Sequence, residues 1–151
     1  MIPPTASLTV RKTLPCSPAE AFRAWTVPEL FREWFVPASG IRVAAEMDLR
    51  TGGKYQIRFQ MPEGKGQVIV DGEFLVIREP SYLEYTWTYV EREKPGMPKN
   101  TVVKISFNEL SQDSTELVLT HEGFVEAEDR DDHNSGWTGI LDCMATAMAK
   151  R

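Results

Sequence analysis

Basic charge and cysteine are both scarce in this chain of 151 residues. Its 17 Lys and Arg residues are outnumbered by 22 Asp and Glu residues, so the net charge at pH 7 is −5. Sequence-independent binding to nucleic acid needs a basic face, and no Lys/Arg run supplies one. Cys16 and Cys143 stand far apart and outside any CxxC pattern. We therefore predict no disulfide framework and no thiolate zinc site, but two reduced thiols in a cytoplasmic protein.

Long apolar runs are missing as well. No uninterrupted apolar stretch is long enough to span a bilayer, so no membrane segment is expected. The N-terminus, Met1-Ile2-Pro3-Pro4, lacks the basic segment and apolar run of a signal peptide. Hydrophobic residues still make up 42% of the chain, which is enough to fill one core. With no repeat or linker in the sequence, we predict a single domain over residues 1–151.

The first part of the chain predicts one strand followed by two short helices. The strand is expected over Leu8–Leu14. Ser17 is a natural helix N-cap, because a proline follows it and Glu20 stands three positions further on. Pro28 interrupts this helix, and a second short helix is expected over Glu29–Trp34.

The middle of the chain alternates between apolar and polar residues. Such period-two patterning between short turns is typical of an antiparallel meander. The dipeptide Asp71-Gly72 lies inside one alternating segment and suggests a bulge or bend rather than a chain reversal. Strands are expected over residues 52–61, 67–77, 82–90, 101–110 and 115–122, with a loop over 93–100.

The end of the chain is predicted to be helical. Apolar residues recur there every three or four positions along about five turns, roughly from Asp131 to Lys150. The stripe consists of Trp137, Ile140, Leu141, Met144, Ala147 and Met148. A long amphipathic helix must bury such a stripe against one face of a curved antiparallel sheet. A cavity between the helix and the sheet would be a suitable place for a small ligand.

Four blocks of the sequence carry a resemblance to a known family. They read SPAEAFRAWTVPELFREWF, DLRTGGKYQIRF, GEFLVIREPSYLEYTW and TELVLTHEGF...DDHNSGWTGILDCM, and they cover the chain from about Leu8 to Met148. In this order they resemble the activator of heat-shock-protein-90 ATPase-like family of the SRPBCC or START-like superfamily. The resemblance implies an α+β helix-grip fold of the START/Bet v type. In that fold a curved antiparallel sheet of about six to seven strands wraps a long C-terminal helix, usually around a cavity.

Three residues are candidates for proton transfer. His121, in phase with Leu117 and Leu119, is either a polar group at a cavity mouth or a histidine that caps the sheet. Tyr85 and Glu122 are the other two candidates. The acidic residues from 122 to 132 match no HExxH motif and no calcium loop, so we interpret them as a loop and a helix start. We expect no metal site and no cofactor, and no GxSxG motif or catalytic triad is present.

The aromatic strand faces and the helical stripe are candidate cavity walls. Periodicity shows which residues share a face but not which face is inside, so these residues form either a ligand pocket or ordinary core. Trp137 has the same two interpretations, as a stacking surface or as a core anchor. The predicted cavity residues are Tyr55, Ile57, Phe59, Tyr85, Trp87, Val103, Ile105, Leu119, His121, Trp137, Leu141 and Met144.

These observations lead to one expected function and two alternatives. We expect a non-catalytic protein, monomeric or homodimeric, that holds a small hydrophobic or aromatic molecule between the C-terminal helix and the sheet. The first alternative is a cyclase- or dehydratase-like enzyme that uses the same cavity. The second is a co-regulator of the heat-shock protein 90 chaperone, which predicts an exposed apolar patch. In the resembling family, the eukaryotic activators engage that chaperone through an additional N-terminal domain, which we do not expect in this chain.

Overall fold

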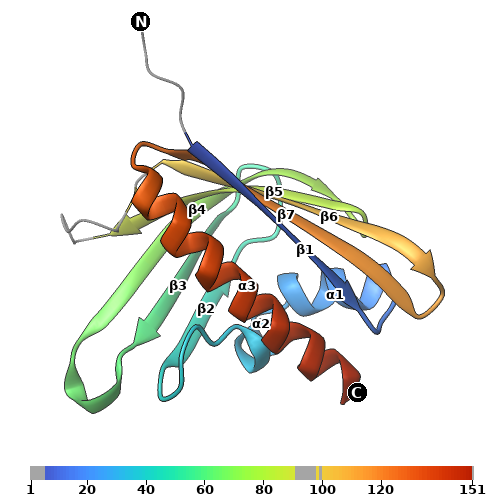
Figure 1. The fold of residues 1–151 in the computed structure, drawn as a ribbon, viewed down its shortest axis with the longest axis horizontal. Helices are drawn as coiled ribbons and strands as arrows, with labels where there is room; N and C mark the ends of the chain where they lie inside the picture. The colour runs from blue at the N-terminus through green and yellow to red at the C-terminus, as the bar shows by residue number, and fades with distance from the viewer. Residues whose placement is uncertain (1–5, 91–97, 99, 151) are drawn as a thin grey trace, which may run out of the picture.

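The computed structural model describes residues 6–90, 98 and 100–150, which form a seven-stranded antiparallel sheet and three α-helices (Figure 1). The strands lie in the order β1-β7-β6-β5-β4-β3-β2. The elements are β1 Ala6–Leu14, α1 Pro18–Thr26, α2 Pro28–Trp34, β2 Arg42–Met47, β3 Lys54–Gln60, the single 3-10 turn η1 Pro62–Gly64, β4 Gln67–Arg78, β5 Tyr82–Val90, β6 Thr101–Ser111, β7 Ser114–Phe124 and α3 Ala127–Ala149.

The long helix α3 crosses the sheet diagonally, and α1 and α2 lie together near its C-terminal half (Figure 1). The apolar stripe of α3 is buried at Trp137, Ile140, Leu141, Met144 and Met148. The predicted α+β helix-grip architecture is therefore confirmed. None of the helices in the described segments is both long and apolar enough to cross a membrane.

The start of α1 has the predicted cap. The backbone N–H of Glu20 donates to Ser17 Oγ, and the backbone N–H of Ser17 donates to Glu20 Oε1, both over 3.2 Å. This reciprocal arrangement is a capping box, and an N-cap side chain of this kind stabilises a helix by about 1 kcal/mol. It fixes the helix that carries Phe22 and Trp25 into the core.

Helix α3 begins four residues earlier than the sequence pattern predicts. Strand β7 continues to Phe124 and α3 starts at Ala127, so only Val125 and Glu126 connect them. The acidic stretch is therefore a strand end and the first turns of a helix, with little loop. The reason is electrostatic, because Glu128 and Asp129 lie in the first turn, where the helix dipole favours negative charge.

Two other local features differ from the sequence expectation. Strand β2 was not located by its pattern, because its inward residues include a small alanine and are only partly buried. Strand β4 runs straight through Asp71-Gly72, and the register shift with β5 lies between Phe74 and Val76 instead. Most of the loop predicted over residues 93–100 lies outside the described residues.

Gly72 is required by close packing rather than by a bend. It pairs with Tyr55 across β3 and β4. A Cβ atom at position 72 would overlap both the Tyr55 ring and the backbone oxygen of Thr86. The Tyr55 hydroxyl donates to that same Thr86 oxygen. Glycine thus lets an aromatic ring lie flat against the neighbouring strand.

A candidate ligand cavity under the C-terminal helix

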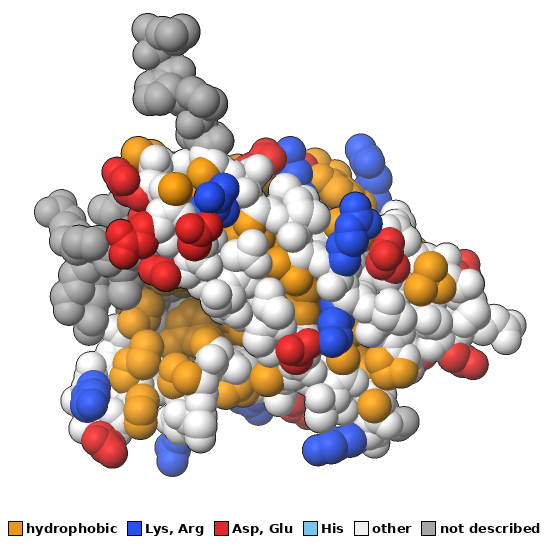
Figure 2. Space-filling view, viewed as in Figure 1, with side chains coloured by type: hydrophobic (Ala, Val, Ile, Leu, Met, Phe, Trp, Pro, Cys, Tyr) orange, Lys and Arg blue, Asp and Glu red, His pale blue; other side chains and the backbone are white. Residues whose placement is uncertain are grey.

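A cavity of about 280 Å³ lies between the first half of α3 and strands β3 to β5. Figure 2 shows the corresponding surface hollowed beneath α3, with hydrophobic side chains around and inside the hollow. Three polar side chains, Tyr89, Asp132 and His133, also line it. The apolar part of the wall includes Phe35, Ile41, Phe59, Val68, Trp87, Trp137 and Ile140.

Trp137 is both a core anchor and a wall of this cavity. Its side chain is only 2% exposed. Its ring stacks on Trp25 at 6.3 Å between centroids and lies 5.3 Å from the ring of Trp87. Its indole N–H donates to His121 Nδ1 over 3.0 Å. These contacts with Trp25, Trp87 and His121 therefore hold the Trp137 ring in one orientation at the cavity wall.

His121 links three strands to the helix through a directional hydrogen-bond chain. Because the Trp137 indole can only donate, His121 Nδ1 accepts and the proton of the neutral ring lies on Nε2. That Nε2–H donates to Thr101 Oγ1 over 2.7 Å. The Thr101 hydroxyl in turn donates to the backbone oxygen of Trp87 over 2.8 Å. Both ring nitrogens of His121 are thus occupied, and the side chain is completely buried.

The surroundings of His121 keep it uncharged. Burial, reinforced by the nearby His133, lowers the pKa of His121 to about 3. Protonation would place an N–H on Nδ1 directly opposite the Trp137 N–H, so two donors would face each other. His121 is therefore a neutral side chain that connects β6 and α3 behind the cavity wall.

A second histidine faces the cavity itself. His133 Nδ1 lies 2.8 Å from the Asp129 carbonyl oxygen, and His133 Nε2 lies 2.8 Å from the Tyr89 hydroxyl. Sequence reasoning did not include His133 among the cavity residues. A signal was present, because His133 precedes Trp137 by four residues and so continues the stripe of α3. Tyr89 likewise follows the inward face of β5 two residues after Trp87.

The sequence model of the family described as activator of Hsp90 ATPase homolog 1-like protein matches residues 15–149 of the chain. The chain belongs to this family. The comparison with curated proteins gives no match.

Several solved structures share the fold. The AHSA1 protein from Silicibacter pomeroyi is 21% identical, with a TM-score of 0.80 over 95% of this chain and 98% of that chain. A protein from Chromobacterium violaceum is also 21% identical, with a TM-score of 0.79 over 94% and 96% of the two chains. The AHSA1-like protein from Aeromonas hydrophila is 17% identical, with a TM-score of 0.77 over 93% and 90%. At these identities the likeness shows the fold alone.

Eleven of the twelve predicted cavity residues of this AHSA1 family member fall into three groups, and the twelfth, His121, does not line the cavity. Phe59, Trp87 and Trp137 line the cavity. Tyr55, Ile57 and Tyr85 surround a much smaller void of about 10 Å³. The remaining aliphatic members have no exposed surface and pack in the core, namely Val103, Ile105, Leu119, Leu141 and Met144. Their participation in ligand binding stays a prediction.

The three candidates for proton transfer do not meet around one void. His121 lies behind the cavity wall. Burial raises the pKa of Tyr85 well above its ordinary value, and the Tyr85 hydroxyl accepts from the Trp25 indole N–H over 3.2 Å. Glu122 is partly exposed on the other face of β7, where it pairs with Lys104 Nζ at 2.8 Å.

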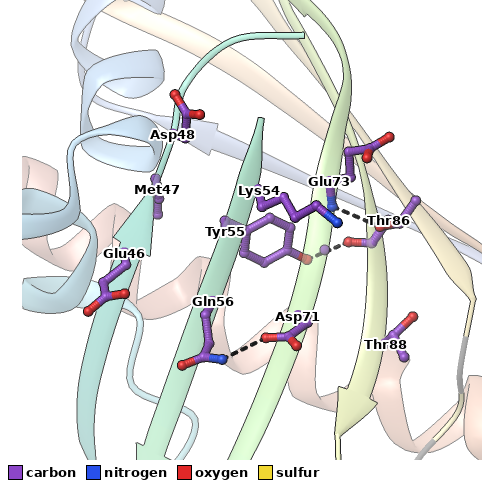
Figure 3. A pocket seen from close by; sticks show the side chains of 11 residues that line it. Glu46, Met47, Asp48, Lys54, Tyr55, Gln56, Asp71, Glu73, Thr86 and Thr88 are labelled. Atoms are coloured by element: carbon purple, nitrogen blue, oxygen red, sulfur yellow. Dashed lines mark hydrogen bonds between the residues drawn. The ribbon is translucent and has the colours of Figure 1, made fainter. Parts of the chain in front are cut away.

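A second hollow, of about 630 Å³, lies beside strands β2 to β5 and is polar (Figure 3). Its carboxylates come from Glu46, Asp48, Asp71 and Glu73. Gln56 Nε2 donates to Asp71 Oδ1 over 2.9 Å, which satisfies one of these carboxylates. Across the described segments, no cluster of three or more His, Cys, Asp or Glu side chains has the geometry to hold a metal ion. We interpret this hollow as solvated polar surface.

Proposed function

We propose that the protein binds a small hydrophobic or aromatic molecule in the cavity beneath α3 without transforming it. The cavity itself carries this proposal. Its volume of about 280 Å³ is near the lower end of typical small-molecule sites, which span about 300–1,000 Å³. The rings of Phe59, Trp87 and Trp137 offer flat apolar surfaces to it. A molecule of about one or two fused rings would match this size.

Co-regulation of a chaperone, which the family name suggests, has less support from the surface. Such docking needs a contiguous exposed apolar patch. The large apolar side chains exposed in the described part of the chain are Leu49, Leu110 and Val125. They belong to the β2–β3 connection, the end of β6 and the β7–α3 connection. This distribution favours the cavity beneath α3 as the functional feature.

Filling the cavity should abolish binding without harming the fold. Gly136 lies on α3 at the cavity wall, and a Cβ atom added there meets nothing within 4 Å. Gly136→Leu is therefore expected to occupy the space that a ligand needs and to weaken binding of naphthalene at least tenfold. Leucine also favours the helix by up to about 1 kcal/mol over glycine, so stability should be kept or improved. Saturation-transfer NMR with naphthalene, together with thermal unfolding, measures both effects.

Gly139→Leu is the matched control. Gly139 lies on the same helix, and an added Cβ atom there also meets nothing within 4 Å, but this residue does not line the cavity. Naphthalene binding should be unchanged in this variant. Equal binding to both leucine variants would contradict the proposed location of the ligand, and no binding to the unmodified protein would contradict the proposed function.

A further inference from the structure

The apolar wall of the cavity is interrupted by polar atoms at one end. Trp87 and Tyr89 extend from the same face of β5, with ring centroids 6.0 Å apart. His133 approaches from α3 and contacts the Tyr89 hydroxyl. All three side chains line the cavity. The hydrogen-bonding capacity that remains at this end decides which ligand groups it can accept.

Tyr89 presents lone pairs to the cavity and not its proton. A carbonyl oxygen can only accept, so His133 Nδ1 must carry a proton to donate to the Asp129 oxygen. Burial lowers the pKa of His133, and the neutral ring therefore leaves Nε2 bare. The Tyr89 hydroxyl donates its single proton to that nitrogen. Its oxygen then has free acceptor capacity only.

Trp87 contributes a hydrogen-bond donor. Its indole Nε1 is enclosed by its neighbours and has no hydrogen-bond partner among the described residues. An enclosed donor without a partner is unfavourable by about 1–3 kcal/mol. The rings of Trp87 and Tyr89 meet edge to face with their centroids 6.0 Å apart, and both side chains line the same cavity. The Trp87 N–H, which lacks an acceptor, and the Tyr89 oxygen, which has free lone pairs, thus belong to neighbouring rings.

We infer that the ligand carries a hydroxyl group, which accepts a hydrogen bond from Trp87 Nε1 and donates one to the Tyr89 oxygen. This inference rests on the proposed binding function. A hydroxyl group is both donor and acceptor, so it satisfies both protein groups at once. A carbonyl or ether oxygen would satisfy Trp87 but would set its lone pairs against those of Tyr89. A pure hydrocarbon would satisfy neither.

Access to Trp87 Nε1 requires a small movement of a side chain. The N–H is shielded from solvent by its neighbours. Tyr89 is only partly buried and stands near the end of β5, so a small shift of its ring that keeps the hydroxyl bonded to His133 can open the Trp87 N–H to a ligand. The ligand class that fits is a phenol or a compact alcohol with an apolar body of one or two rings.

Isothermal titration calorimetry with 2-naphthol and 2-methoxynaphthalene tests this inference. The two probes share the ring system, but the ether has no proton to donate. We divide the dissociation constant of 2-methoxynaphthalene by that of 2-naphthol. This ratio should fall about tenfold in Tyr89→Phe, because 2-naphthol loses one hydrogen bond, which contributes about 0.5–1.5 kcal/mol. Plain naphthalene makes no hydrogen bond, so its affinity measures any change in packing that Tyr89→Phe causes. Trp87→Phe removes the other partner and should lower affinity for both oxygen-bearing probes relative to naphthalene.

Tyr82→Phe is the matched control. Tyr82 lies on the same strand, but its hydroxyl donates to Glu84 and does not line the cavity. The probe ratio should be unchanged in this variant. A ratio that stays the same in Tyr89→Phe, with naphthalene still bound, would overturn the hydroxyl inference and leave the proposed function standing. Failure of all three probes to bind the unmodified protein would instead refute the proposed function.

Discussion

Lowering the pH from 7.5 to 4.5 should reduce the free energy of unfolding by roughly 2–3 kcal/mol through His121 alone. The folded pKa of this group is about 3, because the ring is buried and lies near His133, whereas the unfolded chain has the ordinary value of about 6.5. Between these two values the unfolded state binds the proton and the native state does not. The full stability is therefore present above about pH 6.5 and is lost as the pH falls toward 3.

His121→Asn removes the titration and leaves an acceptor near the Trp137 N–H. We expect this variant to be less stable than the unmodified protein at pH 7.5, because the bond to Thr101 is lost. Between pH 7.5 and 4.5 the free energy of unfolding of this variant should fall by less than that of the unmodified protein. The difference should be the roughly 2–3 kcal/mol assigned to His121. Urea unfolding followed by circular dichroism at several pH values measures both quantities.

The chain has only one other histidine, which supplies the comparison. Burial lowers the pKa of His133 as well, so it adds to acid destabilisation in the same direction. The His133→Asn variant should nevertheless still show the acid-induced loss of unfolding free energy that His121 causes. An unchanged pH dependence in His121→Asn would contradict the neutral, doubly bonded state that we assign to this ring.

Gly72→Ala should destabilise the protein by about 3 kcal/mol, although alanine normally suits a strand better than glycine does. The added Cβ atom would overlap the Tyr55 ring and the Thr86 backbone oxygen. Both neighbours are constrained, because the Tyr55 hydroxyl is bonded to that same oxygen. Relief therefore requires that β4 move away from β3 or β5. Thermal and urea unfolding of the variant measure the loss.

Two further variants separate this overlap from the general effect of replacing glycine. Gly139→Ala, where the new Cβ meets nothing within 4 Å, should leave stability unchanged or raise it by up to about 1 kcal/mol. Tyr55→Leu introduced together with Gly72→Ala should recover part of the loss, because the ring contact disappears while the Thr86 oxygen remains. A Gly72→Ala protein as stable as the unmodified one would show that the strands yield easily at this point.

Sequence periodicity predicted which side chains share a face, and it did so well where the apolar residues are large. The alternation of Leu83, Tyr85 and Trp87 and the stripe through Trp137 and Leu141 both correspond to buried residues. The capping residues of α1 were equally readable, because a capping box depends on neighbours three residues apart. Strand β2 was missed since its inward alanine is too small to make the period visible.

The arrangement of the site was less predictable, because it depends on contacts between distant segments. The Tyr89–His133 hydrogen bond joins residues 44 positions apart, and the Trp137–His121 bond joins a helix to a strand. The hydrophobic period of a sequence shows which side chains share a face, but it does not give the distances between side chains on different strands or on the helix. For the same reason, the sequence did not separate the cavity walls from the solid core around Ile105 and Leu119, which have no exposed surface.

The arrangement of the tryptophans has a consequence for the intrinsic fluorescence of the protein. All four are at most 3% exposed. Their rings form a connected series, with centroids 4.8 Å apart for Trp25 and Trp34, 6.3 Å for Trp25 and Trp137, and 5.3 Å for Trp137 and Trp87. Indoles this close can exchange excitation energy, so we expect the four to act as one set whose emission is blue-shifted by burial. Two of its members form the wall of the cavity, and the emission of the whole set therefore reports on what occupies it.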